Sequence, residues 1–120
     1  MNQHEKINYL ELPARDLTAV KSFFSTVFDW RFTDYGPEYT AFAATAGLDG
    51  GFYKADMQAS TANGSALIVF YSEALEETRD KIEKAGGVIC KAIFAFPGGR
   101  RFHFNDPNGN EYAVWSDKGL

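Results

Sequence analysis

The two halves of the chain predict the same order of secondary-structure elements: a strand, a helix and then three strands. In the first half these elements are expected at 7–12, 17–28, 31–35, 39–44 and 51–54. In the second half they are expected at 66–71, 75–85, 88–91, 100–105 and 110–116. Apolar residues spaced three and four apart predict the helices, and short apolar runs between Gly and Pro predict the strands. Asp16 is placed to cap the first helix, and Gly86-Gly87 to end the second. The order βαβββ therefore occurs twice.

A chain of 120 residues predicts one domain, here with module one at about 5–56, a small polar linker at about 55–64 and module two at about 65–118. The net charge of −4 and the lack of Lys/Arg runs argue against nucleic-acid or anionic-membrane partners. No segment approaches the roughly 20 apolar residues of a membrane span, and the start lacks the apolar core of a signal peptide. Cys90 lies in an apolar run and is expected to be a small buried hydrophobe. These features predict a cytoplasmic protein.

The segment FHFNDPNGNEYAVW, at 102–115, predicts a hairpin with two different faces. The corner from Asp106 to Gly109 carries the residues of a type I turn, with Gly suited to the left-handed conformation that closes a bulged hairpin. Side chains alternate along a strand, so one face should hold only apolar residues, Phe102, Phe104, Tyr112 and Val114. The other face should be mixed: Arg101, His103, Glu111, Ala113 and Trp115.

The segments INYLELPARDLTAVKSFFSTVFDW and FNDPNGNEYAVW, about 90 residues apart, resemble the vicinal oxygen chelate superfamily, which contains glyoxalase I, bleomycin resistance proteins, fosfomycin resistance enzymes and extradiol dioxygenases. The resemblance covers nearly the whole chain. It implies an α+β fold in which two βαβββ modules form a curled, mixed, eight-stranded sheet around a concave cavity, with the helices on the outer face. It also implies a homodimer.

Metal-dependent members of the superfamily place His or Glu ligands on inward positions of the first and last strands of the modules. Carried over residue by residue, these positions fall on Ile7, near Ala66, around 51–53 and on Ala113. None of these residues supplies the N or O ligands that a catalytic divalent site needs. The sequence therefore predicts no metal site and no cofactor.

The resemblance also assigns the residues that line the cavity. In the first strand they are Ile7, Tyr9 and Glu11, with Leu10 and Leu12 in the core, and in the strand that opens module two they are Ala66, Ile68 and Phe70. In the hairpin they are the mixed face, so the expected ligand-binding set is Tyr9, Glu11, Ile68, Phe70, Arg101, His103, Glu111 and Trp115. Such an apolar and aromatic pocket with a few polar groups suits a small molecule.

The predicted polar residues also have structural interpretations. Glu11 could be an outward residue of an edge strand or an ion-pair partner of Arg101, and His103 could be a satisfied structural imidazole. Glu111 is expected to be exposed beside the turn. If the chain is a catalyst, Glu11 and His103 are the candidate acid and base, and both are expected to converge with Arg101 on one cavity.

Two classes of function remain open. One is a metal-free module that binds a small hydrophobic or aromatic compound, as bleomycin resistance proteins do, and the missing ligands favour it. The other is an enzyme of the superfamily, either a lyase or dioxygenase whose metal ligands lie elsewhere or a metal-free acid/base catalyst.

Overall fold

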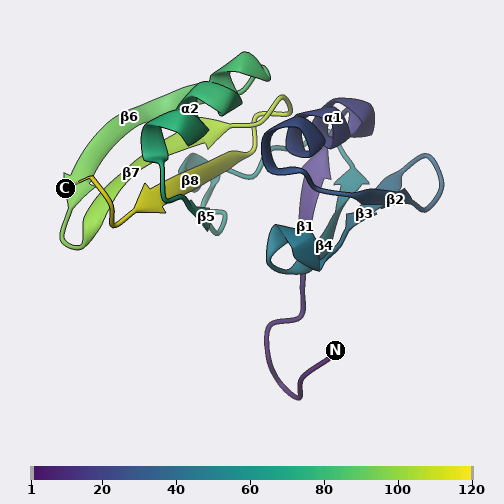
Figure 1. The fold of residues 1–120 in the computed structure, drawn as a ribbon. Coiled ribbons are helices and arrows are strands. Elements are labelled where there is room, and N and C mark those ends of the chain that lie inside the picture. The colour runs from purple at the N-terminus through teal and green to yellow at the C-terminus, as the bar shows by residue number, and fades with distance from the viewer. Residues whose placement is uncertain (1, 120) are drawn as a thin grey trace. The chain divides into compact units, whose positions relative to one another are not determined.

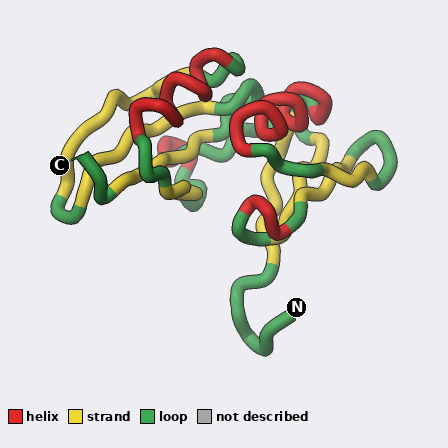
Figure 2. Tube along the Cα trace, in the orientation of Figure 1, coloured by secondary structure: helices red, strands yellow, loops and turns green. Residues whose placement is uncertain are grey.

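The computed structural model describes residues 2–119 and contains two compact units, the first ending at Met57 and the second beginning at Gln58. Each unit holds one four-stranded mixed sheet and one α-helix (Figure 1). Figure 2 separates these strands, in yellow, from the helices, in red, which include the short 3-10 turns η1 (Ala44–Ala46) and η2 (Thr61–Asn63). The expected α+β class with two βαβββ modules is confirmed. Within this range no helix has both the length and the apolar character needed to cross a membrane.

The first sheet has the order β1-β4-β3-β2, with β1 parallel to β4 and the other neighbours antiparallel. Its strands are β1 (Tyr9–Ala14), β2 (Phe32–Asp34), β3 (Tyr39–Phe42) and β4 (Asp49–Lys54). The sequence predicts that the first strand stops before Pro13, but β1 continues through it to Ala14. Proline has no N–H to donate, and an edge strand such as β1 tolerates this because, within residues 2–119, one side of its backbone has no strand partner.

Helix α1 (Leu17–Phe28) begins at the predicted cap, where Oδ1 of Asp16 accepts a hydrogen bond of 3.1 Å from the backbone N–H of Ala19. Its buried side chains are spaced three and four apart: Val20, Phe23, Phe24 and Val27. The Phe24 ring stacks on Trp30 at 4.5 Å and on Phe52 of β4 at 5.7 Å. The apolar stripe of the helix therefore covers one face of the first sheet.

The second sheet has the order β5-β8-β7-β6, with β5 parallel to β8. Its strands are β5 (Ile68–Tyr71), β6 (Val88–Phe96), β7 (Gly99–Asn105) and β8 (Glu111–Ser116). Strand β6 is much longer than the predicted 88–91, and its pairing with β7 is irregular between Ile89 and Phe94. Such irregularities let a strand bend without losing its partner.

Helix α2 (Leu75–Lys84) covers one face of the second sheet and ends as predicted at Gly86-Gly87. Gly86 has a φ of 98°, and the N–H of Gly87 reaches back to the carbonyl of Ile82 over 2.9 Å. Beneath α2 the predicted apolar face of the hairpin is fully buried, comprising Phe102, Phe104, Tyr112 and Val114.

The corner at the end of β7 is the predicted turn, since the N–H of Gly109 donates to the carbonyl of Asp106 over 2.9 Å and Gly109 has a φ of 94°. The buried carboxylate of Asp106 accepts hydrogen bonds from the backbone of Asn108 and Asn110 and from the hydroxyl of Tyr112. Burial nevertheless raises the pKa of Asp106. Its bonds are local to the corner and give it a structural role.

Residues 58–64, which the sequence assigns to the linker, are bonded to this corner. Gln58 donates to the carbonyl of Asn108, and the N–H of Ala59 donates to the side chain of Asn110. The N–H of Glu111 returns a bond of 2.8 Å to the carbonyl of Ala59. The segment therefore belongs to the second unit and is not a free spacer.

Candidate functional site

The face of the second sheet that α2 leaves uncovered gathers most of the chemistry-bearing residues, and we call it the second open face. Arg101 and His103 of β7 pair with Trp115 and Ala113 of β8, so these side chains share one face. Glu111 lies on the same face, because it is two residues from Ala113. The alternation predicted for the closing hairpin is confirmed.

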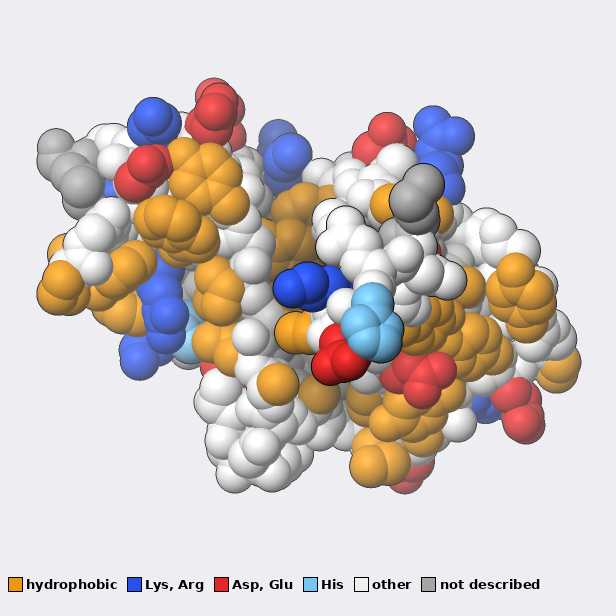
Figure 3. All heavy atoms as spheres, turned by 90° about the horizontal axis from the view of Figure 1, so that it is seen from below, with side chains coloured by type: hydrophobic (Ala, Val, Ile, Leu, Met, Phe, Trp, Pro, Cys, Tyr) orange, Lys and Arg blue, Asp and Glu red, His pale blue; other side chains and the backbone are white. Residues whose placement is uncertain are grey.

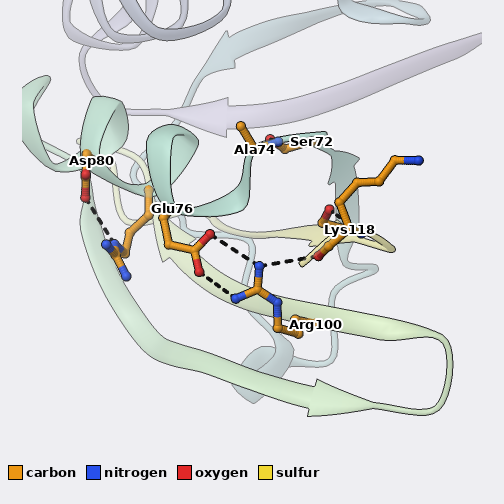
Figure 4. Close-up of polar contacts among 8 residues, drawn as sticks. Ser72, Ala74, Glu76, Asp80, Arg100 and Lys118 are labelled. Carbon is orange, nitrogen blue, oxygen red and sulfur yellow. Dashed lines mark hydrogen bonds and ion pairs between the residues drawn. The ribbon is translucent and has the colours of Figure 1, made fainter. Parts of the chain in front are cut away.

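The two adjacent arginines point to opposite faces. Arg100 reaches α2, where its guanidinium forms an ion pair of 2.5 Å with Glu76, and it also donates to the carbonyl of Lys118 (Figure 4). The Arg100 guanidinium lowers the pKa of Glu76 to about 2. Arg101, one residue on, must lie on the second open face.

Strand β5 corrects the sequence prediction. Ile68 and Phe70 pair with Tyr112 and Val114, and the Phe70 ring lies 6.0 Å from that of Tyr112. Both side chains are therefore on the helix-covered face, away from Arg101, and their predicted place in the cavity is wrong. The residues of β5 on the second open face are Val69 and Tyr71, paired with Ala113 and Trp115 and about half exposed.

Aromatic rings and two cations cover the part of the second open face that lies away from the Asp106–Gly109 turn. The guanidinium of Arg101 lies 5.4 Å from the ring centroid of Phe94 and 5.8 Å from that of Phe96. The ammonium of Lys91 lies 4.8 Å from the Phe94 centroid, and Trp115 contacts Phe96. In the left half of Figure 3, blue side chains run between orange ones. Within residues 2–119 neither Arg101 nor Lys91 has an acidic partner.

The residues Phe94 and Phe96 were missed because the predicted strand stopped at Lys91. Their alternation, Phe-Ala-Phe, is a strand signal that would have extended it. The rings of Phe94 and Phe96 lie against the guanidinium of Arg101, and we call these two rings the aromatic floor.

A buried imidazole and a largely buried carboxylate lie at the turn end of the second open face. Nδ1 of His103 is 2.8 Å from Oε2 of Glu111, and the two side chains are only 6% and 13% exposed. The other oxygen of Glu111 accepts bonds of 2.8 Å from both the N–H and the hydroxyl of Thr61. The hydrogen bond from His103 is the main cause that lowers the pKa of Glu111. The expectation that Glu111 is exposed is therefore wrong.

A cavity of about 360 Å³ adjoins this pair, and its lining includes Thr61, Cys90, Lys91, His103 and Glu111. Cys90 is exposed, which overturns the expectation of a buried residue. Partial burial and the charge of Glu111 raise the pKa of the Cys90 thiol. A raised pKa leaves less of the nucleophilic thiolate at neutral pH.

The first unit has its own sheet face that α1 leaves uncovered. We call it the first open face, and it carries Tyr9 and Glu11 of β1. Tyr39 of β3 crosses this face and donates to Oε2 of Glu11 over 2.9 Å, while its oxygen lies 2.6 Å from the Tyr9 hydroxyl. Tyr39 has one proton and gives it to Glu11, so Tyr9 must be the donor to Tyr39. Burial, followed by these two bonds, raises the pKa of Tyr39.

Gly51 makes room for this arrangement, because a Cβ there would collide with the Tyr39 hydroxyl and ring. Tyr39 was not among the predicted site residues, although a glycine within a strand signals the close approach of another group. The carboxylate partner of His103 within its unit is Glu111. Glu11 belongs to the first unit, and its convergence with Arg101 and His103 stays a prediction.

Comparison with known proteins places the chain in a family. The sequence profile of the Glyoxalase/Bleomycin resistance protein/Dioxygenase superfamily matches residues 6–114. The chain belongs to this superfamily. No curated protein sequence matches it.

Solved structures of the superfamily share the fold at low identity. A superfamily enzyme from Burkholderia phytofirmans PsJN has a TM-score of 0.75 at 16% identity, covering 91% of this chain and 96% of its own. A fosfomycin resistance protein from Listeria monocytogenes has a TM-score of 0.77 at 18% identity, covering 98% and 96%. Lactoylglutathione lyase from Agrobacterium tumefaciens has 0.69 at 19% identity, covering 96% of each chain. At such identities the likeness shows the fold alone.

The metal positions implied by the glyoxalase superfamily hold no ligand side chains here. They fall on Ile7, Ala66, Ala113 and the stretch 51–53, where the Tyr39 ring lies against Gly51. In the part of the chain that the structure describes, no three His, Cys, Asp or Glu side chains form a group that could hold a metal ion. The residues present do not fit a divalent metal site of this type.

Proposed function

We propose that the chain binds a small organic anion with an aromatic or apolar body, without a metal, on the second open face. The observation that carries this proposal is the pair of cations, Arg101 and Lys91, held over the Phe94 ring without an acidic partner in residues 2–119. An unpaired guanidinium that is half-buried on aromatic rings attracts an anion strongly, because the surroundings exclude water. Phe94, Phe96 and Trp115 offer rings on which the apolar body can stack.

The remaining predicted residues take supporting roles in this proposal. His103 and Glu111 supply polar groups beside Arg101, and Tyr9 and Glu11 are proposed as ligand contacts on the first open face. A variant of the Listeria fosfomycin resistance protein was solved with manganese(II) and a dihydroxypropylphosphonic acid, which is an organic anion. This relative supports an organic anion as the class of ligand. The described part of the present chain lacks the side chains that would hold the metal.

The test is a calorimetric titration with benzoate, which combines one carboxylate with one ring. Arg101→Ala should weaken binding by about 1.5 to 3 kcal/mol, the range for a charge-assisted hydrogen bond. Arg100→Ala is the matched control, because Arg100 lies under α2 and is paired with Glu76. Equal effects of the two substitutions would contradict the proposed site.

Acid/base catalysis is the second candidate, and the His103–Glu111 pair favours it. A carboxylate that fixes one imidazole nitrogen leaves the other free to take a proton from a substrate. A reaction of this kind should be lost when His103 is replaced. Metal analysis of protein purified without chelators should give much less than one equivalent of Ni, Zn, Mn or Fe. A stoichiometric metal would overturn the metal-free proposals.

We also propose that the protein is a cytoplasmic homodimer. β1 and β5 are edge strands of their sheets, and such edges invite pairing with another chain. The exposed free thiol of Cys90 suits a reducing compartment. A monomer mass from light scattering at micromolar concentration would refute the dimer.

A further inference from the structure

One nitrogen of His103 is buried without any hydrogen-bond partner. The side chain is 6% exposed, and among the described residues nothing bonds to its Nε2. Buried polar atoms are nearly always paired, so an orphaned one requires an explanation. A group that a ligand brings to this atom would provide one.

The partners of Glu111 determine which chemistry Nε2 offers. Both donors of Thr61 bond to Oε1, and Nδ1 of His103 faces Oε2. The depressed pKa of Glu111 keeps this carboxyl ionised at neutral pH, so it can only accept, and Nδ1 must carry the proton. In the neutral imidazole Nε2 is therefore a lone-pair acceptor.

We propose that the ligand carries, besides its anionic group, a hydroxyl or N–H that donates to Nε2 of His103. This inference rests on the proposed function and narrows its ligand class to hydroxylated or amino-substituted aromatic acids. Arg101 and His103 are two residues apart on β7 and share the second open face, so their Cα atoms are roughly 7 Å apart. A ring bearing its carboxylate and its donor on non-adjacent carbons can reach both side chains.

The aromatic floor lies between the same two residues. The Phe94 ring lies 6.0 Å from the His103 ring and 5.4 Å from the Arg101 guanidinium. Lys91, the cross-strand partner of His103, is exposed and places its ammonium over Phe94. A lysine side chain moves at little cost, so an incoming anion can draw this ammonium aside and reach the imidazole.

The experiment compares probes that differ only in the donor. The affinities of meta- and para-hydroxybenzoate are measured by calorimetry against benzoate and against the matching methoxybenzoates, which have the oxygen but no proton to donate. At least one hydroxybenzoate should bind about fivefold tighter than its methoxy partner, as expected for one net hydrogen bond. Equal affinities in a protein that binds benzoate would overturn the inference alone. Failure of benzoate to bind would overturn the proposed function, and the inference with it.

Variants locate the acceptor. In His103→Asn the amide N–H can still donate to Glu111, but no atom takes the place of Nε2. The affinities for a hydroxybenzoate and for its methoxy partner should therefore become about equal in this variant. Arg101→Ala should weaken both probes alike and keep the ratio, and Arg100→Ala should change neither affinity. A ratio that persists in His103→Asn would contradict the assignment.

Glu111 acts as a positioning residue, and its test needs a readout of the imidazole itself. The Gln side chain in Glu111→Gln can donate to Nδ1 as well as accept from it, so the tautomer of His103 protonated at Nε2 should become populated. The affinity ratio of hydroxybenzoate to methoxybenzoate should then fall. Heteronuclear NMR of the His103 ring nitrogens should show the Nδ1-protonated form in the parent and a mixture in the variant. An unchanged tautomer together with an unchanged ratio would exclude this role.

Discussion

Oε2 of Glu111 lies 2.8 Å from Nδ1 of His103, while Oε1 of the same carboxylate holds both donors of Thr61. One side chain thus joins β7, β8 and the segment that precedes β5. Three charge-assisted hydrogen bonds therefore converge on one nearly buried carboxylate.

We expect Glu111→Gln to lower the free energy of unfolding at neutral pH by about 1.5 to 3 kcal/mol, the range for hydrogen bonds to a charged group. The folded-state pKa of Glu111 is depressed, so its stabilisation is present above the pKa of the unfolded carboxyl and is lost as the pH falls through the folded value. When the free energies of unfolding are measured in urea at several acidic pH values, the difference between the parent and the variant should therefore shrink as the pH falls. Glu38→Gln, an exposed residue of the first unit, should show no such convergence.

Arg100→Ala should lower the urea midpoint without changing the affinity for benzoate, because Arg100 ties β7 to α2 and to the carbonyl of Lys118. The pKa of Glu76 is lowered to about 2 by this guanidinium, so the stabilisation is complete above the ordinary carboxyl range. It should diminish as the pH falls toward about 2. Denaturation curves at a series of pH values test this, and a pH-independent difference would argue against the ion pair.

Gly51→Ala should destabilise the first unit by about 1 to 3 kcal/mol, as overpacking does. The added Cβ meets the Tyr39 ring and the carbonyl of Thr40, and the second of these cannot move without the strand. Tyr39→Phe removes the bonds of this hydroxyl to Glu11 and Tyr9 but introduces no clash with the backbone, so it should cost less. Tyr35→Phe, which alters an exposed tyrosine, is the matched control for the loss of a hydroxyl. A harmless Gly51→Ala would show that Tyr39 does not lie against this glycine.

Cys90 should react with a thiol reagent in the folded protein, because it is exposed, but more slowly than a free thiol at neutral pH. Partial burial is the first cause of its raised pKa and the charge of Glu111 the second. Glu111→Gln removes the second cause and should speed the reaction. Reaction rates followed by absorbance test this, and a slower reaction in the variant would contradict the assignment.

Local sequence determined the features that depend on neighbours in the chain. Asp16 at the start of α1, Gly86-Gly87 after α2 and the corner from Asp106 to Gly109 all occupy their predicted places. Each is governed by backbone conformation or by a hydrogen bond to a residue at most a few positions away. The polar alternation of β1 and of the closing hairpin was likewise sufficient to assign their faces.

The tertiary structure alone decided the rest. In β5 all four residues, Ile68 to Tyr71, are apolar or aromatic, so no alternation indicates which face is covered, and the parallel pairing with β8 sets it. The partner of His103 could not be identified from the sequence either, since alternation along the strands placed both Glu11 and Glu111 on the predicted cavity side. Only the pairing of β7 with β8 places Glu111 at hydrogen-bonding distance from the imidazole. Period two determines which residues share a face of one strand, whereas contacts between strands depend on register, which is fixed when the sheet packs beneath its helix.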